Sequence, residues 1–183
     1  GIYGDRGDEQ LDEKSATGSG FLAEVTKRWE ELARSADARV VILRIGIVLA
    51  SNGGALAKLL LPFRLGAGGP MGNGRQWMSW IDREDVLRMI EWSIDQPAAR
   101  GVFNATAPGP VTNRDFAKTL GRVLHRPAIL PAPAFALRIV LGREMANEML
   151  LAGQRVLPKR ASEEGFTFAY PELTAALTHA VSG

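Results

Sequence analysis

The residues with the clearest potential for chemistry lie between Gly72 and Asp85, in the run GNGRQWMSWIDRED. Two glycines make a tight turn there, and the strand predicted over residues 76–81 carries the amide of Gln76 and the indole of Trp77. An indole offers a flat apolar face and an amide offers placed hydrogen bonds, which together suit a binding pocket. The structural alternative is a hairpin that leads into a surface helix, because packing residues give the same pattern.

Composition excludes several kinds of site. The 183 residues include no cysteine, which excludes disulfides, thiolate catalysis and cysteine-ligated zinc. His125 and His179 are far apart in sequence, so we expect neither a Ser-His-Asp triad nor a metal site, and no metal is predicted. A net charge of +2 gives no argument for nucleic acid. No apolar run approaches the about 18 residues of a membrane helix, so we expect a cytoplasmic protein that does not contact the membrane.

The elements that must position these residues follow an α/β order. Apolar residues recur every three or four positions over residues 21–36, which predicts an amphipathic helix. Residues 39–50 form a β-branched run that indicates a buried strand of a parallel sheet. Ser19, Asp82 and Thr112 are the predicted N-caps. Further helices are predicted at residues 54–65, 82–96, 113–124, 135–141, 144–151, 159–164 and 171–181, and strands or extended pieces at 76–81, 101–105, 127–133, 155–157 and 166–168.

Two features leave their interpretation open. Gly46 interrupts the strand of residues 39–50, and a glycine there either lets a ligand approach the backbone or forms a β-bulge. Residues 1–4, with the sequence GIYG, are typical of the end of a strand that enters a loop. Because domains rarely begin in this way, we expect the chain to be the C-terminal part of a longer protein.

The order of the pieces matches a known pattern. A strand ending in Tyr-Gly is followed by a loop, a helix and a buried strand that contains RIGIV, and then by a G-x-G-x-Q turn, a strand and a helix opened by Asp-Val. This order resembles the extended short-chain dehydrogenase/reductase superfamily of sugar-nucleotide epimerases and dehydratases. Within it, the chain is most similar to the epimerase subgroup with a distinctive C-terminal domain, also described as cell-division-inhibitor-like. The matching runs cover nearly the whole chain: GGALAKLLLPFRLGAGGPMGNGRQWMSWI, NATAPGPVTNRDF, HRPAILPAPAFALR and GQRVLPKR.

The resemblance implies an α/β fold, namely the C-terminal part of a Rossmann-type NAD(P)-binding domain plus a small α+β substrate domain. Residues 1–50 would end the Rossmann-type domain. Residues 51–183 would form mainly the substrate domain, with residues 82–106 packing back on the Rossmann sheet. The cofactor would be NADP or NAD. The glycine turn that holds its pyrophosphate in the family is absent, because the glycine cluster at residues 66–74 lies between a helix and a strand.

Two departures from the family leave the reaction and the catalytic residues unknown. In the wider family a tyrosine four residues before a lysine acts as acid and base, but Leu22 and Thr26 occupy these positions here, and the subgroup also lacks the pair. The arginine that grips a nucleotide-sugar diphosphate is replaced by Met78, which argues against a UDP-sugar or dTDP-sugar. Other residues could supply charge, although each is typical of a solvated surface: Lys58, Arg64, Arg75, Arg155 and Lys159.

We interpret the chain as the C-terminal part of an NAD(P)-dependent epimerase- or dehydratase-like oxidoreductase, incomplete alone, whose small-molecule substrate is unknown. Gly46→Val is predicted to block the cofactor with little loss of folding. The predicted site residues are Gly46, Ile47 and Val48 for the nicotinamide end of the cofactor, and Gln76, Trp77 and Asn104 for the substrate pocket.

Two other classes of function stay open. The missing tyrosine and lysine favour a non-catalytic protein that keeps the fold and uses NAD(P) as a sensor or structural ligand. The abrupt start of the chain favours a protein-interaction domain. The sheet edge and apolar surface left exposed by the missing half of the domain would promote self-association, so we expect a dimer or a larger species in solution.

Overall fold

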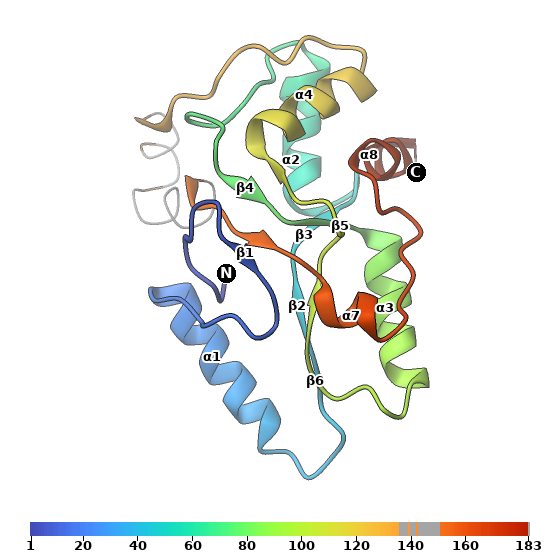
Figure 1. The fold of residues 1–183 in the computed structure, drawn as a ribbon. Helices are drawn as coiled ribbons and strands as arrows, with labels where there is room; N and C mark the ends of the chain where they lie inside the picture. Colours follow the sequence, from blue (N-terminus) through green and yellow to red (C-terminus); the bar gives the residue numbers. More distant parts are fainter. Residues whose placement is uncertain (136–138, 140–141, 143–150, 183) are drawn as a thin grey trace.

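Two parallel strands, β2 (Val41–Ile45) and β6 (Gly101–Ala105), lie at the centre of the molecule (Figure 1). The computed structural model describes residues 1–135, 139, 142 and 151–182. Each residue of β2 faces one residue of β6, from Val41 opposite Gly101 to Ile45 opposite Ala105. The β-branched run thus forms the predicted parallel pairing, and the fold is of the α/β, Rossmann type.

The predicted strand of residues 39–50 divides at Gly46 into β2 and β3 (Ile47–Leu49). The N–H of Gly46 donates to Ala105 O of β6 over 3.0 Å, and the next N–H, of Ile47, donates to Ser79 O over 2.8 Å. Strand β3 then pairs in parallel with β5 (Trp80–Asp82). The chain therefore changes its strand partner at the glycine.

The predicted strand of residues 76–81 also divides. Strand β4 (Trp77–Met78) pairs antiparallel with β7 (Val111–Thr112), whereas β5 pairs with β3. Ser79 lies between the two strands, and its hydroxyl donates to Gln154 O over 2.6 Å and accepts from the N–H of Val156 over 2.8 Å. The hairpin alternative is wrong, because the strand that follows the glycine turn pairs with β7 and β3 and not with the residues just before the turn.

The predicted helices of the first two thirds of the chain are confirmed. They are α1 (Phe21–Arg34), α2 (Gly54–Arg64), α3 (Arg83–Asp95) and α4 (Asn113–Val123). Pro62 lies in the last turn of α2, so the helix ends near the proline, as predicted.

Two of the three predicted N-caps are present. The Asp82 side chain accepts from the N–H of Glu84 over 2.8 Å at the start of α3, and the Thr112 hydroxyl accepts from the N–H of Asp115 over 3.2 Å at the start of α4. The predicted cap of α1 by Ser19 is wrong. Gly20 takes that position and offers no side-chain oxygen.

Strand β8 (Arg155–Val156) pairs in parallel with β1 (Gln10–Leu11), and helices α7 (Lys159–Glu163) and α8 (Leu173–Ser182) follow. Two predicted strands are wrong. Residues 1–4 form a turn, and residues 166–168 pair with no strand of the described residues. The rings of Phe166 and Phe168 pack edge to face, 4.8 Å apart. The helices predicted at 135–141 and 144–151 lie almost wholly on residues that the structure does not describe.

Two hydrophobic cores hold most of these elements together, and a third cluster, of Ile2, Tyr3, Leu11 and Val156, joins β1 and β8 to the first residues of the chain. The larger joins α2, α4 and α8 around the fully buried Trp80, and the smaller joins α3 and α7 to β6 around Phe103. No helix of the described residues is long and apolar enough to cross a membrane. The cytoplasmic location stays a prediction.

Candidate functional site

A cavity of about 770 Å³ opens between helix α1 and strand β2. Residues 41–47 of β2 and β3 form one wall, and α1 contributes the opposite wall through residues that include Leu22, Thr26 and Trp29. The cavity extends to the carboxyl end of β2, where the chain changes partner at Gly46. Its end there is closed by Tyr3, Ser79, Asn104 and Val156.

The structure brings four of the six predicted site residues to this cavity. Gly46, Ile47, Trp77 and Asn104 line it. Val48 does not, because its side chain packs against the smaller core. Gln76 also lies outside the lining, and its amide donates to Met71 O over 3.1 Å. The cofactor and substrate roles of all six residues stay predictions.

Backbone packing alone requires a glycine at position 46. A Cβ there would lie 2.5 Å from Ser79 O and 2.9 Å from Thr106 Cγ2. The backbone oxygen cannot move without disturbing the hydrogen bond between Ile47 and Ser79. The prediction that Gly46→Val spares folding is therefore wrong, and loss of cofactor binding in that variant would not identify a cofactor contact.

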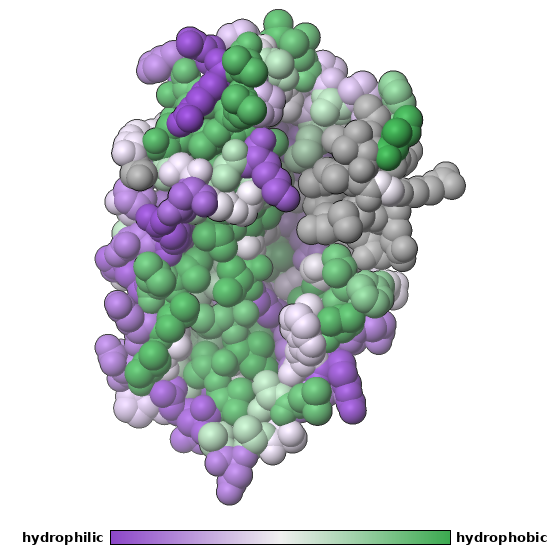
Figure 2. Space-filling model, turned by 180° about the vertical axis from the view of Figure 1, so that it is seen from behind, coloured by the Kyte–Doolittle hydropathy of each residue, from purple (hydrophilic) through white to green (hydrophobic). Residues whose placement is uncertain are grey.

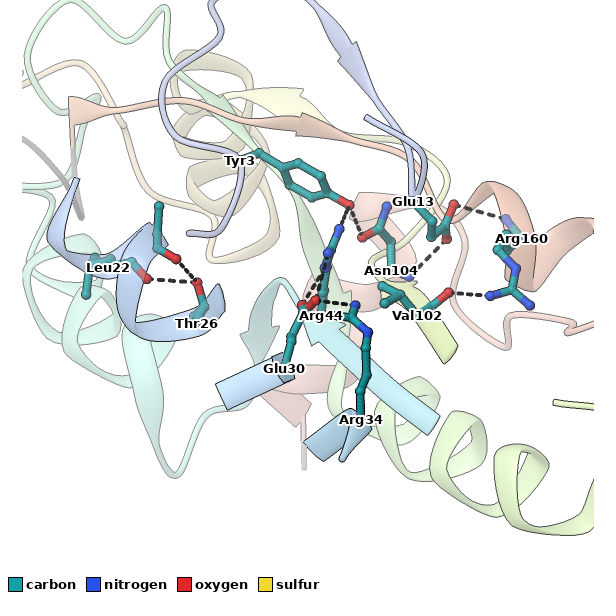
Figure 3. A network of polar contacts seen from close by, with 11 residues as sticks. Tyr3, Glu13, Leu22, Thr26, Glu30, Arg34, Arg44, Val102, Asn104 and Arg160 are labelled. Atoms are coloured by element: carbon teal, nitrogen blue, oxygen red, sulfur yellow. Dashed lines mark hydrogen bonds and ion pairs between the residues drawn. The ribbon is translucent and has the colours of Figure 1, made fainter. Parts of the chain in front are cut away.

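A buried polar network joins the two walls of the cavity (Figure 3). Glu30 of α1 accepts two hydrogen bonds from the Arg44 guanidinium of β2, from Nε over 2.7 Å and from Nη2 over 2.9 Å. Arg44 Nη1 also donates to the Tyr3 hydroxyl over 2.8 Å, and that hydroxyl donates to Asn104 Oδ1 over 2.7 Å. Arg34 adds a second cation to Glu30, 2.8 Å from Oε2. Helix α1 is thus attached to the sheet by ions and hydrogen bonds.

The network fixes the charge states of its members. Burial on its own would raise the pKa of Glu30, but the hydrogen bonds and charges of Arg44 and Arg34 outweigh it and lower that pKa. Burial raises the pKa of the Tyr3 phenol above its usual 10.0, despite the nearby Arg44. At neutral pH, Glu30 and Arg44 are therefore ionised and Tyr3 is protonated.

Asn104 is anchored on several sides. Its Oδ1 accepts from Tyr3, its Nδ2 donates to Leu157 O over 3.1 Å, and its backbone N–H donates to Glu13 Oε1 over 2.9 Å. Glu13 Oε2 also accepts from the N–H of Arg160 over 3.3 Å. These contacts hold the fully buried Asn104 amide in one orientation.

Trp77 is oriented by contacts on two sides. Its indole N–H donates to Asp8 Oδ1 over 2.7 Å, and the Arg155 guanidinium carbon lies 4.4 Å from the ring centroid. The indole therefore has a fixed orientation at the cavity, as a binding face requires.

Neither residue at the position of the family's acid/base pair can replace it. Leu22 is aliphatic, and the Thr26 hydroxyl is held by its own helix, 2.8 Å from Leu22 O and 3.0 Å from Ala23 O. Both residues line the cavity. Its α1 wall therefore presents no group that could exchange a proton near neutral pH at these two positions.

Sequence reasoning did not assign Tyr3, Glu30 or Arg44 to a site. One signal was present, because Arg44 is a charged residue inside a run of buried apolar positions, and such a residue needs a partner. The sequence could not identify its partners, since Glu30 lies 14 residues away on a helix and Tyr3 lies 41 residues away. No cluster of His, Cys, Asp or Glu that could hold a metal ion occurs in the part of the chain that the structure describes.

Comparison with known proteins gives matches over nearly the whole chain. The model of a family described as a domain of unknown function, DUF1731, matches residues 132–180. The Arabidopsis thaliana protein named epimerase family protein SDR39U1 homolog, chloroplastic, is 45% identical over 179 residues, which are 97% of this chain and 51% of that protein. The Bacillus subtilis protein named epimerase family protein YfhF is 41% identical over 186 residues, which are 100% of this chain and 60% of that protein.

A solved structure matches equally well. The human epimerase family protein SDR39U1, isoform 2, determined with NADPH, superposes with a TM-score of 0.94 at 38% identity. The match covers 100% of this chain and 62% of the human chain. The chain thus spans between about half and three fifths of the length of these relatives.

Proposed function

The chain belongs to the epimerase family proteins of the short-chain dehydrogenase/reductase superfamily, as their C-terminal part, and on this basis we propose that it completes an NAD(P) site. Its contribution is the nicotinamide end of that site and the substrate pocket of an NAD(P)-dependent, epimerase-like oxidoreductase. The human relative was determined with NADPH, which supports a nicotinamide dinucleotide as the cofactor.

The observation that carries this proposal is the place of the cavity. It runs along β2 and reaches the carboxyl end of that strand, where the chain leaves one parallel partner for another at Gly46. In open α/β sheets, ligands bind outside the carboxyl ends of strands where the strand order changes. A volume of about 770 Å³ is in the range of small-molecule sites.

The residues present fit the nicotinamide end of the cofactor better than its pyrophosphate. The lining is mostly apolar, and its two charged side chains, Glu30 and Arg44, already bind each other. That environment suits a flat uncharged ring. A pyrophosphate needs free N–H groups at a glycine-rich turn between a strand and a helix, and the glycines of residues 66–74 instead lie between α2 and β4.

Bound NAD(P) would supply hydride transfer. The chain's own residues would hold the ring against Gly46 and Ile47 and would present Trp77 and Asn104 to a substrate. A further acid or base would have to come from elsewhere, because Leu22 and Thr26 cannot act as one.

The presence of Leu22 and Thr26 at the two acid/base positions favours a second candidate, a non-catalytic NAD(P) sensor. A site that binds a dinucleotide but offers no proton donor where the superfamily has its tyrosine and lysine is suited to binding without turnover. Turnover separates the two candidates. Hydride exchange with any member of a panel of carbonyl compounds and sugars supports the enzyme, whereas tight NADPH binding without turnover supports the sensor.

The proposal is tested by calorimetric titration of NADPH and NADH into two proteins. One is this 183-residue chain. The other is the same chain extended at its N-terminus with the preceding residues of the Bacillus subtilis relative. We expect only the extended protein to bind, and the better ligand identifies the cofactor. Tight binding by the short chain would overturn the placement of the nicotinamide end.

A matched pair of variants locates the site in the extended protein. Leu22→Trp places a large ring in the cavity and should weaken NADPH binding by at least tenfold. Phe21→Trp adds the same ring at the neighbouring position, which is 67% exposed, and should leave the affinity unchanged. Equal effects of the two substitutions would place the cofactor elsewhere.

A further inference from the structure

The end of α2 and the segment that follows α4 run side by side at one end of the molecule, where residues 127–133 cross the top of Figure 1. Arg126 Nε donates to Arg64 O over 3.0 Å. Four residues further along, the N–H of Leu130 donates to Gly68 O over 3.2 Å. The two segments are therefore fixed to each other by hydrogen bonds.

A turn at His125 directs the second segment from α4 toward α2. His125 adopts a left-handed backbone conformation, with a φ of 55°, which is uncommon for a residue other than glycine. The N–H of Arg126 then donates to Gly121 O over 2.9 Å and closes the helix. A Cβ on Gly121 would lie 2.6 Å from the Cβ of Ala128, so the segment packs closely against α4. Both helices thus hold the segment in place.

Large apolar side chains project from this part of the molecule. Ile129 is 77% exposed and Leu65 is 74% exposed, and Leu61 and Leu130 are each more than half exposed. In the described part of the chain, none of the four lines the cavity at Gly46 or the small pocket beside His179. They project into solvent, whereas a peptide ligand is usually held in a groove or along a sheet edge.

The same surface carries basic side chains and no acidic one. Residues 50–81 and 116–135 contain no aspartate or glutamate, although the whole chain contains 20 of them. Arg64, Arg122 and Arg126 are exposed, and none of the three forms an ion pair with a described residue. Figure 2 shows hydrophilic and apolar side chains next to each other at this end. We call this surface the crest, and it consists of Leu61, Arg64, Leu65, Arg122, Arg126, Ile129 and Leu130.

We propose that the crest binds the surface of an anionic lipid bilayer. Exposed aliphatic side chains gain free energy at the boundary between headgroups and acyl chains, and arginines beside them are attracted by the negative charge of the headgroups. A single-stranded nucleic acid suits the crest less well, because such strands stack on aromatic rings and the crest contains none.

The proposal is compatible with the other features of the chain. We expected no contact with a membrane because the sequence has no long apolar run, but such a run is required for a spanning helix and not for a surface that lies on a bilayer. Helix α1 and strand β2, which form the walls of the cavity, lie away from the crest in Figure 1. A chain bound through the crest would keep the cavity accessible, and the inference does not depend on the cofactor.

The experiment is cosedimentation of this chain with vesicles of phosphatidylcholine that contain about 30% phosphatidylglycerol, and with vesicles of phosphatidylcholine alone. We expect at least tenfold tighter binding to the anionic vesicles. Binding should fall at least tenfold between about 0.1 M and about 0.5 M sodium chloride, because salt screens the arginines. Sodium phosphate at the same ionic strength should have no larger effect than the chloride, since the ligand is a bilayer and not a phosphate ion.

Matched substitutions locate the binding surface. Arg64→Gln combined with Arg122→Gln should weaken binding to the anionic vesicles by at least tenfold, whereas Arg88→Gln, at an exposed position of α3, should change it little. Ile129→Asn should weaken it by about fivefold. Ile94→Asn is the control for that variant, because Ile94 is 64% exposed on α3.

The absence of cysteine from the chain allows insertion into the bilayer to be measured directly. Ile129→Cys and Ile94→Cys each accept one thiol-reactive fluorophore whose emission depends on polarity. The emission of the label at position 129 should shift to shorter wavelength when anionic vesicles are added. The emission of the label at position 94 should stay unchanged.

Three results would overturn the proposal. The first is equal binding to the two kinds of vesicle. The second is an equal effect of substitution at Ile129 and Ile94, because the chain would then adhere through apolar surface in general. The third is binding of a single-stranded oligonucleotide or of polyglutamate as tight as that of the anionic vesicles, which would identify another class of ligand. If the vesicles bind as expected and NADPH does not bind to the extended protein, the proposed function fails and this inference stands.

Discussion

Helices α1 and α8 are both amphipathic, but the rest of the chain holds them by different means. Helix α8 buries four apolar side chains in the larger core. Helix α1, although longer, fully buries only Ala23 and Glu30 and leaves Phe21, Trp29 and Leu32 exposed. It is attached across the cavity by the ion pair of Glu30 with Arg44.

The difference is that α8 packs in a hydrophobic core, whereas the apolar side of α1 is largely exposed. Apolar packing requires a complementary surface, and the described residues supply that surface for α8. An ion pair fixes the orientation of a helix but adds little net free energy, because both charges lose their hydration. Helix α1 is therefore positioned as one wall of the cavity, in which we propose that the nicotinamide end of the cofactor binds.

The largest contrast should come from removing one leucine from each helix. Leu177 of α8 is fully buried, so Leu177→Ala should lower the free energy of unfolding by between about 3 and 4 kcal/mol. Leu32 of α1 is 56% exposed, so Leu32→Ala should change it by less than about 0.5 kcal/mol. Urea denaturation measures both, and similar losses would show that α1 is packed as firmly as α8.

The junction between the two regions should be almost as sensitive. Gly46→Ala places a Cβ 2.5 Å from Ser79 O and should cost about 2.5 kcal/mol of unfolding free energy. Gly109→Ala is the control, because its Cβ would meet only Pro171 O, at 3.8 Å. Thermal unfolding compares the two variants, and a stable Gly46→Ala protein would contradict the close approach of Gly46 to the Ser79 backbone.

Neutralising the ion pair of α1 should have a smaller effect. Glu30→Gln removes the charge that binds Arg44 and should cost about 2 kcal/mol of unfolding free energy at pH 7. Glu31→Gln, one residue along the same helix, breaks only an exposed pair with Arg28 and should cost less than about 0.5 kcal/mol. Equal costs would mean that α1 depends on neither carboxylate.

The pH dependence of stability sharpens the same point. The pKa of Glu30 is lowered in the folded protein, so its contribution is complete above its unfolded value of about 4.3 and is lost as the pH falls through the folded value. Stability of the parent protein should therefore fall more steeply below about pH 4 than that of Glu30→Gln. Urea denaturation from acid pH up to pH 7 measures how the free energy of unfolding of each protein depends on pH. The same pH dependence in the two proteins would contradict the prediction.

The smallest effect should arise at the rim of the cavity. Trp77→Phe keeps an aromatic ring but loses the hydrogen bond to Asp8, which should cost about 1 kcal/mol of unfolding free energy. Asp8→Ala removes the other partner. A double-mutant cycle measures their coupling, and strictly additive losses would show that the bond does not orient the indole.

The sequence by itself determined the local elements of this protein. The three- and four-residue apolar spacing of residues 21–36 and the capping oxygens of Asp82 and Thr112 act within one or two turns of chain, so they predict α1, α3 and α4 correctly. The β-branched run of residues 39–50 predicted a parallel strand, because strands buried on both faces of a sheet have continuous apolar sequences. The long matching runs also identified the family, which the relatives bear out.

The tertiary structure alone decided how these elements meet. Strand partners change at Gly46 and Ser79, and periodicity cannot show a change of partner because both halves of each run remain extended and apolar. The cavity network joins Tyr3 to Asn104 across 101 residues, and Glu30 to Arg44 across 14. The sequence indicates that a buried arginine or tyrosine needs a hydrogen-bonding partner. Only the folded chain brings that partner within hydrogen-bonding distance.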